Sequence, residues 1–229
     1  MRPVDKGSAA ITYSKYQDAQ NDLIERIGDY CSYCERQIET NLAVEHIQPK
    51  SKVPTLCNEW SNFLLGCVNC NSCKGDQDID PDEYFWPDSD NTSLAFDYLA
   101  GGLVVTHPAL NSINQLIAQR TIETFGLDRD PGNPNKKKCP TPKDKRWQKR
   151  NEIWNLAQTQ LTRLQSEDTQ NIRELIVELA ISRGLFSIWM KVFEKDPDMR
   201  CRLISGFKGT ALDCFDISGL AISRLGGRL

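Results

Sequence analysis

A histidine beside an acidic residue is the most informative feature of the sequence. His46 is one of only two histidines in 229 residues, and it follows Glu45 in the segment AVEHIQPKS, residues 43–51. A neutral imidazole can take a proton from water, and a carboxylate can hold a hard divalent cation. The pair therefore predicts metal-assisted hydrolysis of a phosphodiester bond.

Three residues further along the chain could complete such a site: Asn62, Asn71 and Lys74. An amide oxygen can bind the same cation, and a lysine can contact a phosphate group. Plainer roles also exist, because Asn62 could be a turn residue, Asn71 a helix N-cap and Lys74 a solvated lysine. Likewise, Glu45 could be a solvated acid at a strand end, and His46 a structural histidine.

Two C-x-x-C pairs enclose this region, Cys31 with Cys34 and Cys67 with Cys70. Each pair can fill two tetrahedral positions of one zinc ion. The total of nine cysteines is odd, and the first residues show no apolar segment, so a secretory leader is not expected. Both points favour metal ligation over disulfides; buried free thiols are the alternative. We expect a closed structural site, in which Cys73 could replace Cys70. The other cysteines read as core or surface thiols: Cys57, Cys139, Cys201 and Cys214.

The elements that must position these residues are mainly helical. Apolar spacing and terminal glycines predict helices over residues 15–28, 111–126, 144–168 and 171–195. The gap of 32 residues between the cysteine pairs must be folded, and it holds the short apolar run NLAVEHI. We expect an α+β, mainly α chain, with a cysteine-rich domain over residues 1–100. A mostly helical extension over residues 101–229 would pack onto it, dock a partner or contact nucleic acid.

The formal net charge of −3 is the sum of two segments of opposite charge, one basic and one acidic, and the rest of the chain. Residues 136–150 hold eight basic residues against one acid, whereas residues 75–119 hold no lysine or arginine. The basic run could bind a phosphate backbone, with Trp147 stacking on a base, or it could be a solvated linker that leads into a helix. Charges interrupt the most apolar stretch, from Ile172, so a membrane span is not expected, and we expect a cytoplasmic protein.

Taken together, E-H-x-x-P-K-S, W-x-N and C-x-x-C-N-x-x-K between paired cysteines resemble the HNH endonucleases. The resemblance implies a ββα-metal fold with a structural Zn²⁺ site and one catalytic Mg²⁺ or Mn²⁺. It assigns His46 as the general base, Asn62 as the middle residue that supports the loop, and Asn71 as a metal ligand. Glu45 would be the second ligand, at a position where aspartate is commoner.

A wider pattern, C-x-Y-C-E before the histidine and D-P-D-x-Y-F-W-P-x-x-D-N after it, resembles one HNH subgroup. That subgroup is the PtuB-like nuclease subunit of Septu-type anti-phage systems, which also occurs beside retrons. The resemblance implies an ABC-type ATPase partner (PtuA-like), and in a retron a reverse transcriptase with its RNA–DNA product. The expected substrate is nucleic acid, with DNA ahead of an RNA such as tRNA. A non-catalytic zinc module that binds nucleic acid or protein is the alternative from another class.

Overall fold

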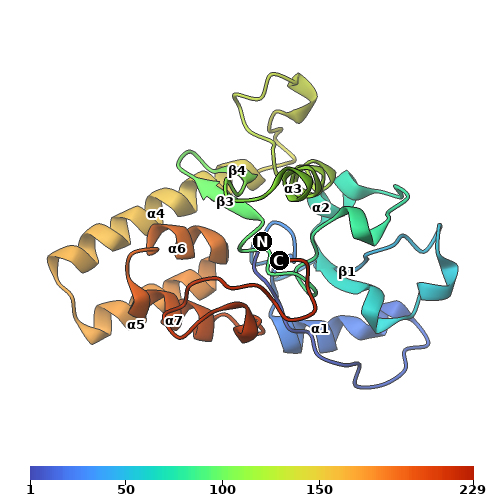
Figure 1. Cartoon of the computed structure of the whole chain (residues 1–229), viewed down its shortest axis with the longest axis horizontal. Helices are drawn as coiled ribbons and strands as arrows, with labels where there is room; N and C mark the ends of the chain where they lie inside the picture. The colour runs from blue at the N-terminus through green and yellow to red at the C-terminus, as the bar shows by residue number, and fades with distance from the viewer.

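A small ββα unit carries the histidine and the second cysteine pair. In the computed structural model, which describes all 229 residues, strands β1 (Ala43–His46) and β2 (Phe63–Gly66) form an antiparallel pair that leads into helix α2 (Val68–Lys74) (Figure 1). The register sets His46 opposite Phe63 and Ala43 opposite Gly66. The loop between the strands contains two single 3-10 turns, Pro54–Leu56 and Trp60–Asn62.

An N-terminal helix packs against this unit. A 3-10 turn, Tyr16–Ala19, continues into α1 (Gln20–Ile27), which buries Leu23 and Ile27. The helix ends at Gly28, whose φ of 77° is accessible to glycine at little cost. The helix expected over residues 15–28 is therefore confirmed, with a tighter first turn.

A second hairpin and a helix occupy the centre of the molecule (Figure 1). Strands β3 (Phe96–Leu99) and β4 (Leu103–Thr106) pair antiparallel, and α3 (Ser112–Thr124) follows β4. The side chain of Asn111 accepts a hydrogen bond from the amide of Asn114 and caps the start of α3. Three further 3-10 turns lie at Pro81–Glu83, Lys136–Lys138 and Leu212–Cys214.

Four helices form the other side of the molecule: α4 (Arg146–Ser166), α5 (Gln170–Arg183), α6 (Phe186–Val192) and α7 (Pro197–Gly206). The prediction of one helix over residues 171–195 was wrong, because the chain breaks between α5 and α6. Gly184 has a φ of 68°, and a Cβ there would lie 2.6 Å from the carbonyl oxygen of Glu35. The close approach of the Glu35 backbone therefore ends the helix at that glycine.

The cysteine-rich part and the helical part share one hydrophobic core. A single connected cluster of 49 buried apolar residues runs from Met1 to Phe215. Tyr33, next to the first cysteine pair, stacks on Phe125 at the end of α3, with ring centroids 3.7 Å apart. Residue 100 lies in the turn between β3 and β4, so the expected boundary falls inside a hairpin and both parts of the chain belong to one packed core. None of the helices is both long and apolar enough to span a membrane.

Candidate active site and zinc centre

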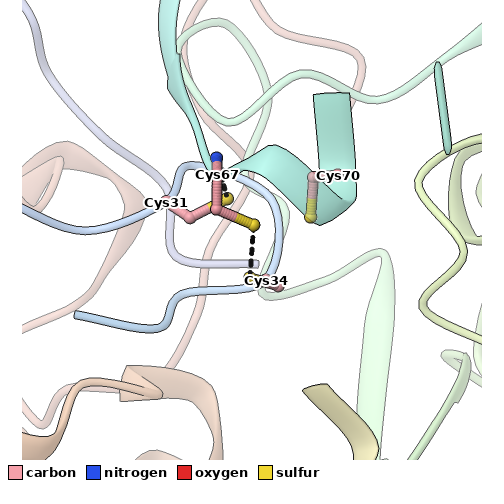
Figure 2. Close-up of side chains that lie close together, drawn as sticks. All are labelled: Cys31, Cys34, Cys67 and Cys70. Carbon is pink, nitrogen blue, oxygen red and sulfur yellow. Dashed lines mark hydrogen bonds between the residues drawn. The ribbon is translucent and has the colours of Figure 1, made fainter. Parts of the chain in front are cut away.

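The four predicted zinc ligands lie together. Cys31 and Cys34 come from the loop after α1, and Cys67 and Cys70 come from the start of α2 (Figure 2). All four are buried, and their sulfur atoms lie within 4.8 Å of one another. Tetrahedral zinc with bonds of about 2.3 Å would hold sulfurs about 3.8 Å apart, and Cys34 Sγ lies 3.7 Å from Cys67 Sγ. The donor set and spacing therefore fit a structural zinc ion.

Two arginines supply the charge that such a centre needs. Zinc held by four thiolates carries a net charge of about −2. Arg36 Nη2 lies 3.3 Å from Cys67 Sγ, and Arg146 Nη1 lies 3.1 Å from Cys70 Sγ. Burial opposes the charge on Arg36, but the Cys34 and Cys67 thiolates outweigh it and raise the pKa of Arg36. Arg146 also contacts Cys73, which lies outside the cluster, so the structure selects Cys70 as the fourth ligand.

Part of the basic run at residues 136–150 is used inside the protein, so neither alternative, a phosphate-binding segment or a solvated linker, holds for all of its members. Arg146 and Arg150 are each only 1% exposed. Lys138 pairs with Asp128, and the indole of Trp147 donates to the carbonyl of Gly101. The exposed members without an ion pair are Lys136, Lys137, Lys143 and Lys145.

His46 is held in one orientation at the end of β1. Its Nε2 lies 2.9 Å from the carbonyl oxygen of Cys57, which can only accept, so Nε2 carries the proton. The ring packs edge-on against Tyr16 and Phe63, with centroid distances of 4.7 and 5.4 Å. In this tautomer the lone pair is on Nδ1, and that atom is the one able to take a proton.

The pKa of His46 also favours the neutral form. Burial lowers this pKa most, and the nearby charges of Lys50 and Lys74 lower it further. The hydrogen bond to the Cys57 carbonyl acts in the opposite direction but is outweighed. A neutral imidazole near pH 7 is the state that a general base requires.

Glu45 and Lys74 form a buried ion pair beside His46. Lys74 Nζ lies 2.7 Å from Glu45 Oε1 and 2.6 Å from the carbonyl oxygen of His46. Lys74 is only 1% exposed, so its ammonium is not free for the phosphate contact expected from the sequence. Glu45 is 4% exposed, which also contradicts the alternative of a solvated acid. Burial raises the pKa of Glu45 despite the opposing effect of Lys74.

Gly66 gives Glu45 its space. A Cβ on Gly66 would lie 2.9 Å from Glu45 Cβ and 3.3 Å from its Cγ. Such distances leave no room for a methyl group unless the strand that carries Glu45 shifts. The missing side chain on β2 thus lets the Glu45 side chain cross the strand pair toward α2.

Asn71 lies on α2, half-buried, and its side chain makes no hydrogen bond within the chain. The N-cap of α2 is Cys67, so the alternative of Asn71 as an N-cap is wrong. Glu45 Oε2 likewise has no hydrogen-bond partner, since Lys74 takes Oε1. One carboxylate oxygen and one amide oxygen are therefore uncommitted, and each is a hard donor of the kind that a divalent cation prefers.

Asn62 supports the loop that follows His46. Its Oδ1 accepts from the amide of Gln48 at 2.8 Å, and its Nδ2 donates to the carbonyls of Gln48 and Leu56 at 3.0 and 3.2 Å. The residue is 3% exposed. These bonds fix both ends of the segment 48–56. The next residue is Cys57, whose carbonyl orients the histidine. Asn62 is thus placed for the loop-supporting role that the resemblance implies.

Sequence reasoning missed two residues that adjoin the histidine. Tyr16 covers one edge of the His46 ring, and Lys50 Nζ lies 3.0 Å from the Tyr16 hydroxyl. Lys50 is one position of the E-H-x-x-P-K-S motif with no role of its own there, and nothing around Tyr16 in the sequence signals a site. Its position depends on how the N-terminal turn packs on β1.

The family model of the HNH endonuclease matches residues 31–77. The matched segment begins at the first zinc cysteine and ends just after α2, so it covers the whole ββα unit. A comparison with curated proteins gives no significant match. Residues 31–77 are thus an HNH endonuclease domain, and the chain is a nuclease that hydrolyses phosphodiester bonds.

Proposed function

We propose that this nuclease cuts nucleic acid, DNA foremost, with His46 as the general base and Glu45 and Asn71 as ligands of Mg²⁺ or Mn²⁺. The main support is the His46 tautomer, because the bond from Nε2 to the Cys57 carbonyl leaves Nδ1 as the acceptor. When bound, the cation would stabilise negative charge on the phosphate and on the leaving oxygen. Cleavage would leave 5′-phosphate and 3′-hydroxyl ends.

Other residues of the chain hold His46, Glu45 and Asn71 in position. Asn62 and the Cys57 carbonyl hold the imidazole, and Lys74 holds Glu45 in place when no cation compensates its charge. The zinc centre fixes α2, which carries Asn71, against the loop of the first cysteine pair. Each of these elements limits the motion of a group that acts on the substrate.

The test is cleavage of DNA and of RNA by His46→Ala across a Mg²⁺ and Mn²⁺ titration. We expect a loss of about 100- to 10,000-fold that no metal concentration restores, because proton removal is the missing function. Glu45→Gln and Asn71→Ala should recover part of their activity at high metal. His107→Ala, the change of the other histidine, is the matched control and should cleave normally. A His46→Ala protein that cleaves at the wild-type rate would exclude His46 as the general base, and absence of cleavage by the wild type would favour the non-catalytic zinc module instead.

We further propose that the nuclease acts in anti-phage defence under an ABC-type ATPase of the Septu type. The support is the resemblance of the flanking motifs, together with a net acidic chain that shows no base-reading motif. Target choice would then come from the partner, with a reverse transcriptase added in a retron. Co-purification from the native operon should recover the ATPase, whereas a chain recovered alone and fully active would contradict it.

A further inference from the structure

Lys50 and Tyr16 form a polar pair next to the His46 imidazole. Lys50 Nζ lies 3.0 Å from the Tyr16 hydroxyl and 4.4 Å from the centre of its ring. Lys50 is exposed and Tyr16 half-exposed, while the ring of Tyr16 contacts His46. The pair thus reaches from the general base to solvent.

The hydrogen bond between Lys50 and Tyr16 leaves other donors of both side chains free to bind a ligand. An ammonium group has three N–H donors and no acceptor, so in the contact with Tyr16 the hydroxyl oxygen accepts. The hydroxyl proton therefore stays free to donate, and so do two N–H groups of Lys50. This hydrogen bond is the main cause that raises the pKa of Lys50, so its positive charge is maintained.

Lys74 cannot supply this function, because its ammonium is held inside by Glu45 and by the His46 carbonyl. Lys50 lies four residues after the histidine, and the hydrogen bond of its ammonium within the chain is to the Tyr16 hydroxyl and not to a carboxylate. A positive charge without a carboxylate partner, beside a free hydroxyl donor, is suited to a phosphate oxygen.

We propose that Lys50 and Tyr16 together bind a backbone phosphate of the nucleic-acid substrate and hold it beside His46. The inference rests on the proposed function for the identity of the ligand. Lys50 contributes charge and N–H donors, and Tyr16 contributes one O–H donor. The Tyr16 ring also keeps the imidazole in its orientation, so it links the phosphate contact to the base.

The experiment measures binding without cleavage. Zinc-loaded protein carrying His46→Ala is titrated into a short labelled DNA duplex, with the equivalent RNA as a second probe, and anisotropy is followed at several salt concentrations. Lys50→Gln, Tyr16→Phe and the control Lys52→Gln are compared on this background. Lys52 is an exposed lysine of the same loop, so its variant removes an equal charge.

For Lys50→Gln we expect affinity to fall about 5- to 10-fold and the slope of log affinity against log salt to shrink by about one. Tyr16→Phe keeps the ring and the charge, so affinity should fall about 2- to 5-fold with an unchanged salt slope. Lys52→Gln should change affinity less than about 2-fold.

Equal losses for Lys50→Gln and Lys52→Gln would overturn the proposal, since only the general field of the protein would then matter. Full affinity in Tyr16→Phe, or no binding to either probe, would also overturn it. Cleavage by the chain with His46 intact is measured separately. Lys50-dependent binding without any cleavage would contradict the proposed function and leave the phosphate site in place.

Discussion

The ammonium group of Lys74 lies 2.7 Å from Glu45 Oε1, and both side chains are almost fully buried. Two charges removed from water in this way stabilise each other only as a pair. The carboxylate expected to bind the catalytic cation is thus already compensated by a positive charge of the protein. A cation that binds Glu45 must therefore share the carboxylate with the Lys74 ammonium.

Lys74→Met should destabilise the zinc-loaded protein, measured without Mg²⁺ or Mn²⁺, by about 3–5 kcal/mol, because it leaves a buried carboxylate without its partner. Urea denaturation measures the loss. The double variant Glu45→Leu/Lys74→Met should recover most of it, and Mg²⁺ should stabilise the single variant more than the wild type. A single variant as stable as wild type would show that the ion pair contributes nothing.

Gly66→Ala should weaken divalent-metal binding while leaving the zinc centre intact. The added methyl group would meet Glu45 Cβ at 2.9 Å, so strands β1 and β2 must shift locally and carry the Glu45 carboxylate with them, at a cost of about 1–3 kcal/mol. Calorimetric titration with Mn²⁺ measures the affinity, and elemental analysis checks that the zinc content is unchanged. If Gly66→Ala bound Mn²⁺ with wild-type affinity, metal binding would not depend on the position that Gly66 allows Glu45 to adopt.

The zinc ligands should be separable from Cys73 by mutation. Serine at Cys31, Cys34, Cys67 or Cys70 should give unfolded or insoluble protein, because metal binding contributes free energy of folding. Cys73→Ser is the matched control, one helical turn beyond Cys70, and should fold with one zinc per chain. Zinc content by elemental analysis decides this prediction. Zinc lost from Cys73→Ser but kept in Cys70→Ser would reverse the assignment.

The parts of the site that depend on local spacing could be predicted from the sequence. Within each C-x-x-C pair a short turn directs both sulfurs to one point, and the two pairs meet as expected because a structural zinc ion takes four ligands. The contact between Lys74 and Glu45 could not be predicted, since it depends on how α2 lies against β1. The same holds for Tyr16, which reaches His46 only because the N-terminal turn packs on that strand.

In the helical half, too, local features could be predicted from the sequence, whereas features that depend on distant segments could not. Apolar periodicity predicted α3 and α4 closely, at residues 112–124 and 146–166. The break at Gly184 was missed because its cause is a distant backbone segment at Glu35. The burial of Arg146 and Arg150 was also missed, because a run of basic residues normally faces solvent and their partners come from other segments.

Arg146 joins the helical half to the zinc centre, and its loss should loosen both. Its guanidinium lies 3.1 Å from Cys70 Sγ and 2.7 Å from Asp144 Oδ2, and it donates to the carbonyl of Phe125. Arg146→Met would leave Asp144 and the thiolates without this charge. We expect destabilisation of about 3–5 kcal/mol and faster transfer of zinc to a chelator.

Lys145→Met provides the matched control, because Lys145 is the preceding residue, is exposed and makes no ion pair. It should release zinc at the wild-type rate, since its charge acts only through solvent. Absorbance of a zinc-binding dye follows the release, and thermal denaturation gives the stability of each variant. Equal zinc release from Arg146→Met and Lys145→Met would mean that the thiolates need no charge from α4. A faster release in Arg146→Met alone would show that the helical half holds the zinc centre, and through α2 the residue Asn71.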